Sequence, residues 1–182
     1  MNFVIEEEKV HNFIKDYFKY LYLKTFLLMD VIWILIFYIE EKNINILTLA
    51  IIIFTTIMGT TMGTFFMYRL HYNEVAKYVK NFYSSNQHKE KEDSIKLICN
   101  FKKYDGPTFG VLHVYCKKIL FIPFKEELQY EKIIINHNNI KDIRINKSSK
   151  AIEISYNNRK VLFALPEREY CIKQIKNKIL LN

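Results

Sequence analysis

The chain has 182 residues, of which 50% are hydrophobic, and its formal net charge is +8. It contains only four glycines and three prolines, which excludes collagen-like and linker-like compositions. This length suffices for one domain of ordinary size together with a membrane element.

Residues 1–20 carry apolar side chains at helical spacing, while Lys15 and Lys19 fall on the opposite side. This pattern predicts an amphipathic N-terminal helix that lies along the membrane surface and bends into the next segment. A simple helical extension of that segment is the alternative. The apolar positions are Val10, Phe13, Ile14, Tyr17, Phe18 and Leu21.

Residues 21–70 are mostly apolar and predict a transmembrane helical hairpin. The second span, residues 46–68, is an uncharged run of 23 residues, and at a rise of about 1.5 Å per residue it reaches roughly 34 Å. The first span, residues 21–39, contains Lys24 near one end, where it can snorkel to the interface. Because the polar turn between the spans is short, we expect the two helices to be antiparallel neighbours.

The orientation of the hairpin follows from the basic residues that flank it. Three lysines precede the first span and a fourth lies near its start, and three basic residues follow the second span, whereas the connecting turn has only Lys42. We therefore expect a two-pass protein of the cell membrane with both termini in the cytoplasm. The flanking residues are Lys9, Lys15, Lys19 and Lys24 on one side and Arg69, Lys77 and Lys80 on the other.

Asp30 lies inside the first span, where an ionised carboxylate costs about 2.5–3.5 kcal/mol or more. Matching the depths of the two spans places Asp30 level with residues 58–60, so the hydroxyls of Thr56, Thr60 and Thr61 come within reach. We interpret Asp30 as a polar lock between the helices, protonated and hydrogen-bonded to threonine. A nonfunctional Asp30 close to the lipid headgroups and a role in transport are the alternatives.

Gly59 and Gly63 form a GxxxG pattern in the second span. Small residues four positions apart let two helix backbones approach closely. The contact predicted here is either with the first span or with a second copy of the chain, which would make a homo-oligomer.

Residues 71–94 are predicted to begin as a helical extension of the second span. The stretch from 84 to 94 is polar, mixed in charge and free of large apolar residues. We expect it to be a flexible tether and a domain boundary.

From residue 95 the pattern changes to short alternating or apolar runs that predict seven strands. Turn residues occur at 105–107 and at 157–158, and Pro166 then opens an amphipathic helix with acids early and lysines late. The expected fold is an α+β membrane protein: a hairpin followed by a seven-stranded β-sandwich, residues 95–182, capped by one helix. The strands are predicted at Ile95–Lys103, Phe109–Cys116, Lys118–Phe124, Glu131–Asn136, Ile140–Asn146, Ala151–Tyr156 and Lys160–Leu165.

Several short motifs in this region resemble the GRAM branch of the PH-like domains. They are a glycine-led strand at 110–115, an apolar-Phe strand at 119–123, an isoleucine run at 133–135 and an Ile-x-x-Ile strand at 140–143. Two spans ahead of such a domain also resemble small bacterial membrane proteins with a C-terminal PH-like domain. The resemblance implies a cytoplasmic binding module for anionic lipids or for proteins.

The phosphoinositide-binding PH pattern has a basic residue at the end of the first strand and basic-x-Arg in the second. Lys102 and Lys103 fill the first place, but the second strand has His113 and Tyr115 and no arginine. We therefore expect a diffuse phosphate-attracting patch rather than a specific inositide site, with a solvated set of strand-end charges as the alternative. Its predicted members are Lys102, Lys103, Lys117 and Lys118.

The basic excess is concentrated in residues 95–182, which hold 17 Lys and Arg against 8 Asp and Glu. A basic domain tethered beside a bilayer is expected to feel the anionic surface of the leaflet. A charge that serves solubility alone is the alternative.

The sequence lacks the motifs of a catalytic or cofactor site. No glycine-rich phosphate loop is present, and the five histidines form no metal-spaced pair. The three cysteines, Cys99, Cys116 and Cys171, are widely spaced and are expected to be buried and reduced. We therefore expect no enzyme activity, no metal, no cofactor and no nucleic-acid partner.

The leading functional hypothesis is a membrane-anchored interaction module. Its basic domain would bind a protein partner or anionic lipid headgroups. The alternative is a structural subunit of a larger transporter or stress/defence assembly, docked through Asp30 and the Gly59/Gly63 face. A hairpin that permeabilises membranes is a third hypothesis.

Overall fold

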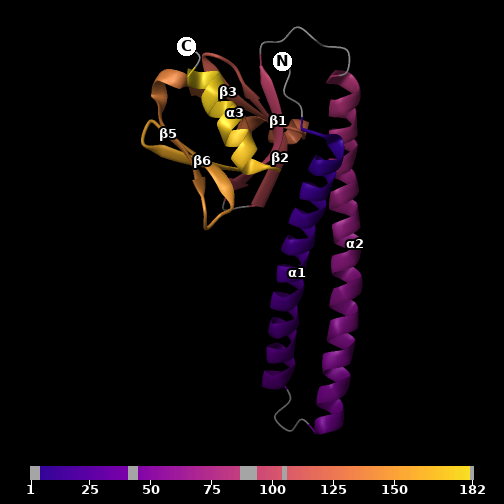
Figure 1. The fold of residues 1–182 in the computed structure, drawn as a ribbon. Coiled ribbons are helices and arrows are strands. Elements are labelled where there is room, and N and C mark those ends of the chain that lie inside the picture. The colour runs from indigo at the N-terminus through magenta and orange to yellow at the C-terminus, as the bar shows by residue number, and fades with distance from the viewer. Residues whose placement is uncertain (1–4, 41–44, 87–93, 104–105, 181–182) are drawn as a thin grey trace. The chain divides into compact units, whose positions relative to one another are not determined.

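The computed structural model describes residues 5–40, 45–86, 94–103 and 106–180. Two long helices, α1 (Glu7–Glu40) and α2 (Ile46–Asn86), precede a seven-stranded sheet and a shorter helix, α3 (Arg168–Leu180) (Figure 1). The chain divides into two compact units. One is Ile14–Ala76, and the other combines Met1–Phe13 with Lys77–Asn182.

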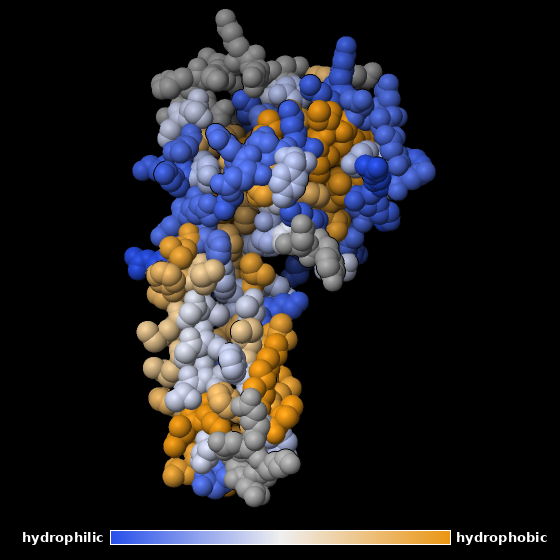
Figure 2. All heavy atoms as spheres, turned by 180° about the vertical axis from the view of Figure 1, so that it is seen from behind, coloured by the Kyte–Doolittle hydropathy of each residue, from blue (hydrophilic) through white to orange (hydrophobic). Residues whose placement is uncertain are grey.

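The unit Ile14–Ala76 is a pair of helices that are long enough and apolar enough to cross a membrane. Almost no residue is buried in the most apolar stretch of either helix. A core helix of a soluble protein would bury such a stretch, whereas lipid-facing helices leave it exposed. Figure 2 shows this apolar surface along the helices. Both helices are thus candidate membrane spans.

Both long helices extend beyond their predicted membrane spans. α2 begins after Asn45, whose side chain accepts a hydrogen bond of 2.8 Å from the Thr48 N–H and so caps the helix. It continues through the predicted extension and takes in residues 84–86 of the expected tether, while residues 87–93 lie outside the described residues. α1 is one continuous helix from Glu7, as in the extension alternative, rather than two elements joined by a bend.

The sheet is antiparallel throughout, with the strand order β4-β3-β2-β1-β7-β6-β5. Three strands have the predicted bounds, and the others differ by one to three residues at an end. The strands are β1 (Ile95–Lys103), β2 (Gly106–Val114), β3 (Lys118–Pro123), β4 (Ile133–Asn136), β5 (Ile140–Asn146), β6 (Ala151–Tyr156) and β7 (Arg159–Ala164).

The largest differences lie at the starts of β2 and β4. Gly106 and Pro107 were expected in a turn but belong to β2, where only β1 lies beside them because β3 first pairs at Gly110. Proline is tolerated where a strand has a single neighbour. β4 begins two residues late because Glu126–Glu131 forms a 3₁₀ helix, η1. Asp105 lies outside the described residues.

Asn157 and Asn158 form the predicted turn. Both have positive φ, 43° and 62°, and they join the paired residues Tyr156 and Arg159. This is the two-residue hairpin loop that asparagine favours.

The inner face of the sheet carries the core of the domain. Phe101, Phe121 and Phe163 come from three strands, and their ring centroids lie 5.4–5.6 Å apart. Gly110 permits the close approach of β2 and β3, because a Cβ there would lie 2.3 Å from the carbonyl oxygen of Ile122. α3 adds the fully buried Cys171 and Ile175.

The ends of the long helices belong to the same unit as the sheet. Tyr78 of α2 stacks on Phe124 with ring centroids 5.6 Å apart, and Lys9 of α1 forms an ion pair of 2.9 Å with Glu167. The Tyr83 hydroxyl donates a 2.6 Å hydrogen bond to the Ile5 carbonyl. The domain therefore includes the ends of α1 and α2, although the sequence predicted that it begins at residue 95.

Candidate functional site

Lys102 and Lys103 are engaged within the domain. The Lys103 ammonium pairs with the Glu131 carboxylate, which also accepts a 2.5 Å hydrogen bond from the Thr108 hydroxyl. Burial alone would raise the pKa of Glu131, but the hydrogen bonds from Lys103 and Thr108 outweigh it and hold that pKa below its usual range. Lys103 thus neutralises an internal acid instead of facing a ligand.

Lys102 donates a 2.5 Å hydrogen bond to the Ser149 carbonyl in the turn between β5 and β6. Burial lowers the pKa of Lys102, and the nearby charge of Lys150 lowers it further. The turn therefore brings two cations close together at this end of β1.

Lys117 and Lys118 lie at the opposite end of the β1–β2 hairpin. The pairing runs from Lys103 and Gly106 at one end to Ile95 and Val114 at the other. Eight steps along a strand separate the ends by roughly 26 Å. The four predicted lysines therefore form two separate groups rather than one patch. Hydrophobic and turn patterns could not give this result, because it depends on strand register.

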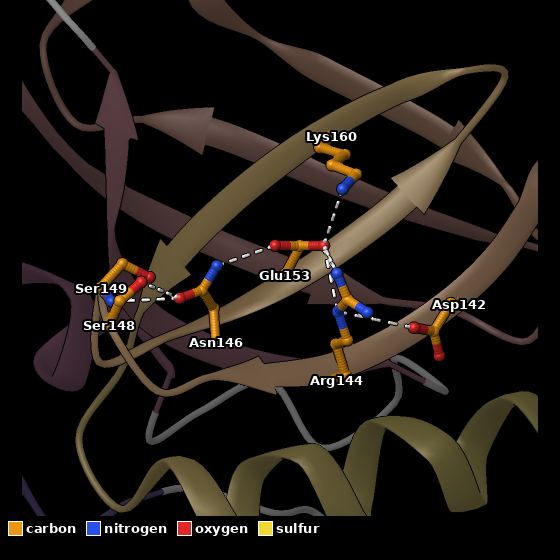
Figure 3. A network of polar contacts seen from close by, with 7 residues as sticks. All are labelled: Asp142, Arg144, Asn146, Ser148, Ser149, Glu153 and Lys160. Carbon is orange, nitrogen blue, oxygen red and sulfur yellow. Dashed lines mark hydrogen bonds and ion pairs between the residues drawn. The ribbon is translucent and has the colours of Figure 1, made fainter.

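One outward face of the sheet, formed by β5, β6 and β7, carries charges that satisfy one another (Figure 3). Glu153 is only 4% exposed. It accepts hydrogen bonds from Arg144 at 2.7 Å and Asn146 at 2.9 Å, and the Lys160 ammonium lies 3.6 Å away. The hydrogen bond from Asn146 contributes most to holding the pKa of Glu153 below its usual range, and the hydrogen bonds from Arg144 lower it further. We call this group the Glu153 network.

The other outward face, formed by β1 to β4, is apolar in its centre. Paired residues of antiparallel strands share a face, and the pairs Ile98–Val111 and Val111–Ile122 follow one row across it. The outward positions of these strands include lysines but no Asp or Glu. The apolar outward residues are Ile98, Phe109, Val111, Leu120, Ile122 and Ile134.

Part of this apolar face is covered. Ile98 is 2% exposed, and Phe109 and Val111 are also buried. The backbone of Phe124, on which Tyr78 stacks, donates a 3.0 Å hydrogen bond to the Phe109 carbonyl. The end of α2 is therefore part of the cover.

Asn100 is an exception on the covered face. Its side chain is fully buried, and neither its amide nitrogen nor its amide oxygen has a hydrogen-bond partner within the described part of the chain. A buried amide without a partner is destabilising. Its outward partner in β7 is Ala164, so a small apolar neighbour leaves the amide unsatisfied on that side.

The helical hairpin contains the polar contact predicted for Asp30. The Thr60 hydroxyl lies 2.7 Å from an Asp30 carboxyl oxygen and 2.8 Å from the Thr56 carbonyl. Asp30 is 8% exposed, and Thr56 is also buried. A carboxyl group satisfied by a threonine of the neighbouring helix fits the lock interpretation.

Gly59 and Gly63 have open space where their side chains would be, since a Cβ at either position meets no atom within 4 Å. α1 therefore does not use the close approach that the GxxxG pattern offers. A shallow groove of about 390 Å³ lies beside Gly59, lined by Trp33, Phe37, Thr55, Thr56, Gly59 and Thr60.

None of the three cysteines forms a disulfide bond, and no group of three metal-binding side chains occurs in the described ranges. Burial raises the pKa of Cys171 to about 12 and that of Cys99 well above its usual value. Both thiols are consequently poor nucleophiles. Cys116 is half-buried.

Sequence reasoning missed the Glu153 network and the exposed Ile134. An acid between Ile152 and Ile154 does signal an outward polar position. The pairing of Glu153 with Arg144 could be predicted only from the β5–β6 register. The exposure of Ile134 could be predicted only from the position of β4 at the edge of the sheet.

Comparisons with known proteins give limited similarity. No family model and no curated protein matches this chain. A similar solved structure is the C-terminal domain of an unknown protein from Leishmania infantum. It is 19% identical, with a TM-score of 0.41, and the match covers 54% of this chain and 91% of that chain.

Proposed function

We propose that this chain is a two-pass membrane protein of the cell membrane, with both termini cytoplasmic, whose basic PH/GRAM-like domain binds anionic lipid headgroups. The order of seven antiparallel strands and one helix supports the PH-like assignment, together with the motif resemblance. The observation that carries the function is the charge excess of residues 95–182 in a chain with two candidate spans.

Internal pairing strengthens this proposal. Glu131, Glu153 and Glu167 each contact at least one cation within the domain. These contacts neutralise several of the eight acids, so further lysines face the solvent with few acids to offset them. Lysines near a bilayer surface gain about 1 kcal/mol each from anionic lipids.

The test uses the full chain in phosphatidylcholine nanodiscs, which provide its membrane without anionic lipid. These nanodiscs are mixed with vesicles of phosphatidylcholine alone or with roughly 30% phosphatidylserine, and co-flotation is measured. We expect association only with the phosphatidylserine vesicles and its loss at about 0.5 M salt. No association with either vesicle would reject the lipid function and favour a protein partner.

A second candidate function is a structural subunit of a larger membrane complex, docked through Asp30 and the Gly59/Gly63 face. The open space at both glycines favours it. Gly59→Leu and Asp30→Asn would then reduce co-purification with other membrane proteins or self-association in detergent. A matched Ile51→Leu control on the same helix would leave both unchanged.

A further inference from the structure

The apolar outward face of β1–β4 continues beyond its covered part. Next to the row Ile98–Val111–Ile122, and two positions further along the strands, lies the row His113–Leu120–Ile134 on the same face. We call these last three residues the β4 strip. Its outer member, Ile134, is 56% exposed, and β4 is the last strand on this side of the sheet.

Basic side chains surround the β4 strip. Lys96 pairs with His113 in the register of β1 and β2, and Lys118 pairs with Asn136 beside Ile134. Lys132 is exposed and directly precedes β4. Leu120 and Ile134 thus form an aliphatic pair with lysines around it and no acid on the same strand positions, which is complementary to an anionic, partly apolar surface.

We propose that the β4 strip is the surface by which the domain contacts an anionic bilayer, with Ile134 entering the headgroup region and Lys118 and Lys132 meeting lipid phosphates. This inference rests on the proposed lipid function and specifies its site. The strip lies beside the row Ile98–Val111–Ile122, of which Ile98 and Val111 are already covered within the chain. A bilayer tied to the same chain is present at high effective concentration.

The predicted Lys102/Lys103 group fits this role less well. Lys103 is paired with Glu131, and Lys102 donates to the Ser149 carbonyl. In addition, neither of the two has an exposed aliphatic partner on its strand row: Lys102 pairs with Pro107 and Leu162, and Leu162 is half-buried.

The experiment places an environment-sensitive fluorophore at Ile134→Cys in the full chain, with Cys116→Ser as background. Cys99 and Cys171 are buried and leave the label on the introduced cysteine. Asp142→Cys, on the outward face of the Glu153 network, is the matched control because Asp142 is also exposed. Both proteins are reconstituted in phosphatidylcholine vesicles with and without phosphatidylserine and with spin-labelled quencher lipid.

We expect a blue shift and lipid quenching of the probe at 134 only with phosphatidylserine, reversed by salt, and no change at 142. If the probe at 134 stays as water-exposed as that at 142, the proposed site is wrong. Should nanodisc flotation still require phosphatidylserine in that case, the lipid function stands and uses another surface. A shift that needs no phosphatidylserine but grows with protein density would assign the strip to a second copy of the chain and overturn the proposal.

A second variant tests the strip without a label. Ile134→Ser should reduce flotation with phosphatidylserine vesicles several-fold, while Asp142→Ser, which removes an acid, should not reduce it. Because Ile134 is more than half exposed, the fold is expected to tolerate this change. Equal flotation of the two variants would contradict the role of Ile134.

Discussion

The residues on the two outward faces of the sheet are buried in different ways. On the β5–β7 face, Glu153 is buried under the cations that it binds, so this surface needs no further partner. On the β1–β4 face, Ile98 and Val111 are also buried, and Tyr78 at the end of α2 stacks on Phe124, which follows β3. One face is satisfied by its own side chains, whereas the other depends on neighbouring chain and leaves Ile134 uncovered.

The largest expected effect comes from breaking the covered face. Ile98→Ala removes a side chain that is 2% exposed, and we expect the free energy of unfolding to fall by about 2–4 kcal/mol. Ser155→Ala, on the other outward face, should change it by less than about 0.5 kcal/mol. Thermal unfolding of the full chain in detergent, followed by circular dichroism, compares the two. Similar losses for both variants would mean that the faces do not differ.

Removing the cover itself should have a smaller effect. Tyr78→Ala loses the stacking on Phe124 and part of the buried aromatic area, so we expect a loss of about 1–2 kcal/mol. Tyr20→Ala is the control, because Tyr20 is 73% exposed on α1. Equal stability of the two variants would show that Tyr78 does not hold the helix end on the sheet.

Asn100 offers a prediction of the opposite sign. Asn100→Val removes an amide that has no partner among the described residues and puts a slightly smaller, branched apolar side chain in its place. We therefore expect stability to rise by about 1 kcal/mol or more. A destabilised Asn100→Val protein would show that the amide makes a contact worth keeping. Asn100→Asp serves as the converse control and should destabilise the domain strongly.

The paired acids predict a pH dependence of stability. The pKa values of Glu131 and Glu153 are lower in the folded protein than their ordinary values. Their contribution is therefore fully present above the unfolded pKa, about 4.3, and is lost as pH falls through the folded pKa values. The double variant Glu131→Gln and Glu153→Gln should be less stable at pH 7 but lose less stability between about pH 4.5 and pH 3. An unchanged acid profile would contradict the pairing.

The sequence predicted much of the fold because local patterns determine it. The bounds of β1, β5 and β6, the Asn157–Asn158 turn and helix α3 all follow from alternation, turn residues and helix signals. Depth matching between the spans also predicted the Asp30–Thr60 contact. These features involve either residues close in sequence or two antiparallel helices of similar length, in which residues at the same depth face one another.

The remaining features depend on long-range register and packing. The sequence predicts one patch that includes Lys102 and Lys118, whereas the strand pairing places these two residues at opposite ends of the β1–β2 hairpin. The association of Tyr78 with Phe124 joins segments that the sequence assigned to a linker and a domain. A local sequence pattern does not indicate which segment packs on which face of the sheet. The difference between the β1–β4 face and the β5–β7 face could therefore not be predicted.

The most direct test of this contrast is the reactivity of a cysteine on each face. Ile98→Cys and Asp142→Cys are compared in the full chain, with Cys116→Ser as background, by the rate of maleimide labelling under native conditions. The covered face predicts that the thiol at 98 reacts at least about tenfold more slowly than that at 142, because it is reached only by local opening. Equal labelling rates in the folded protein would contradict the account.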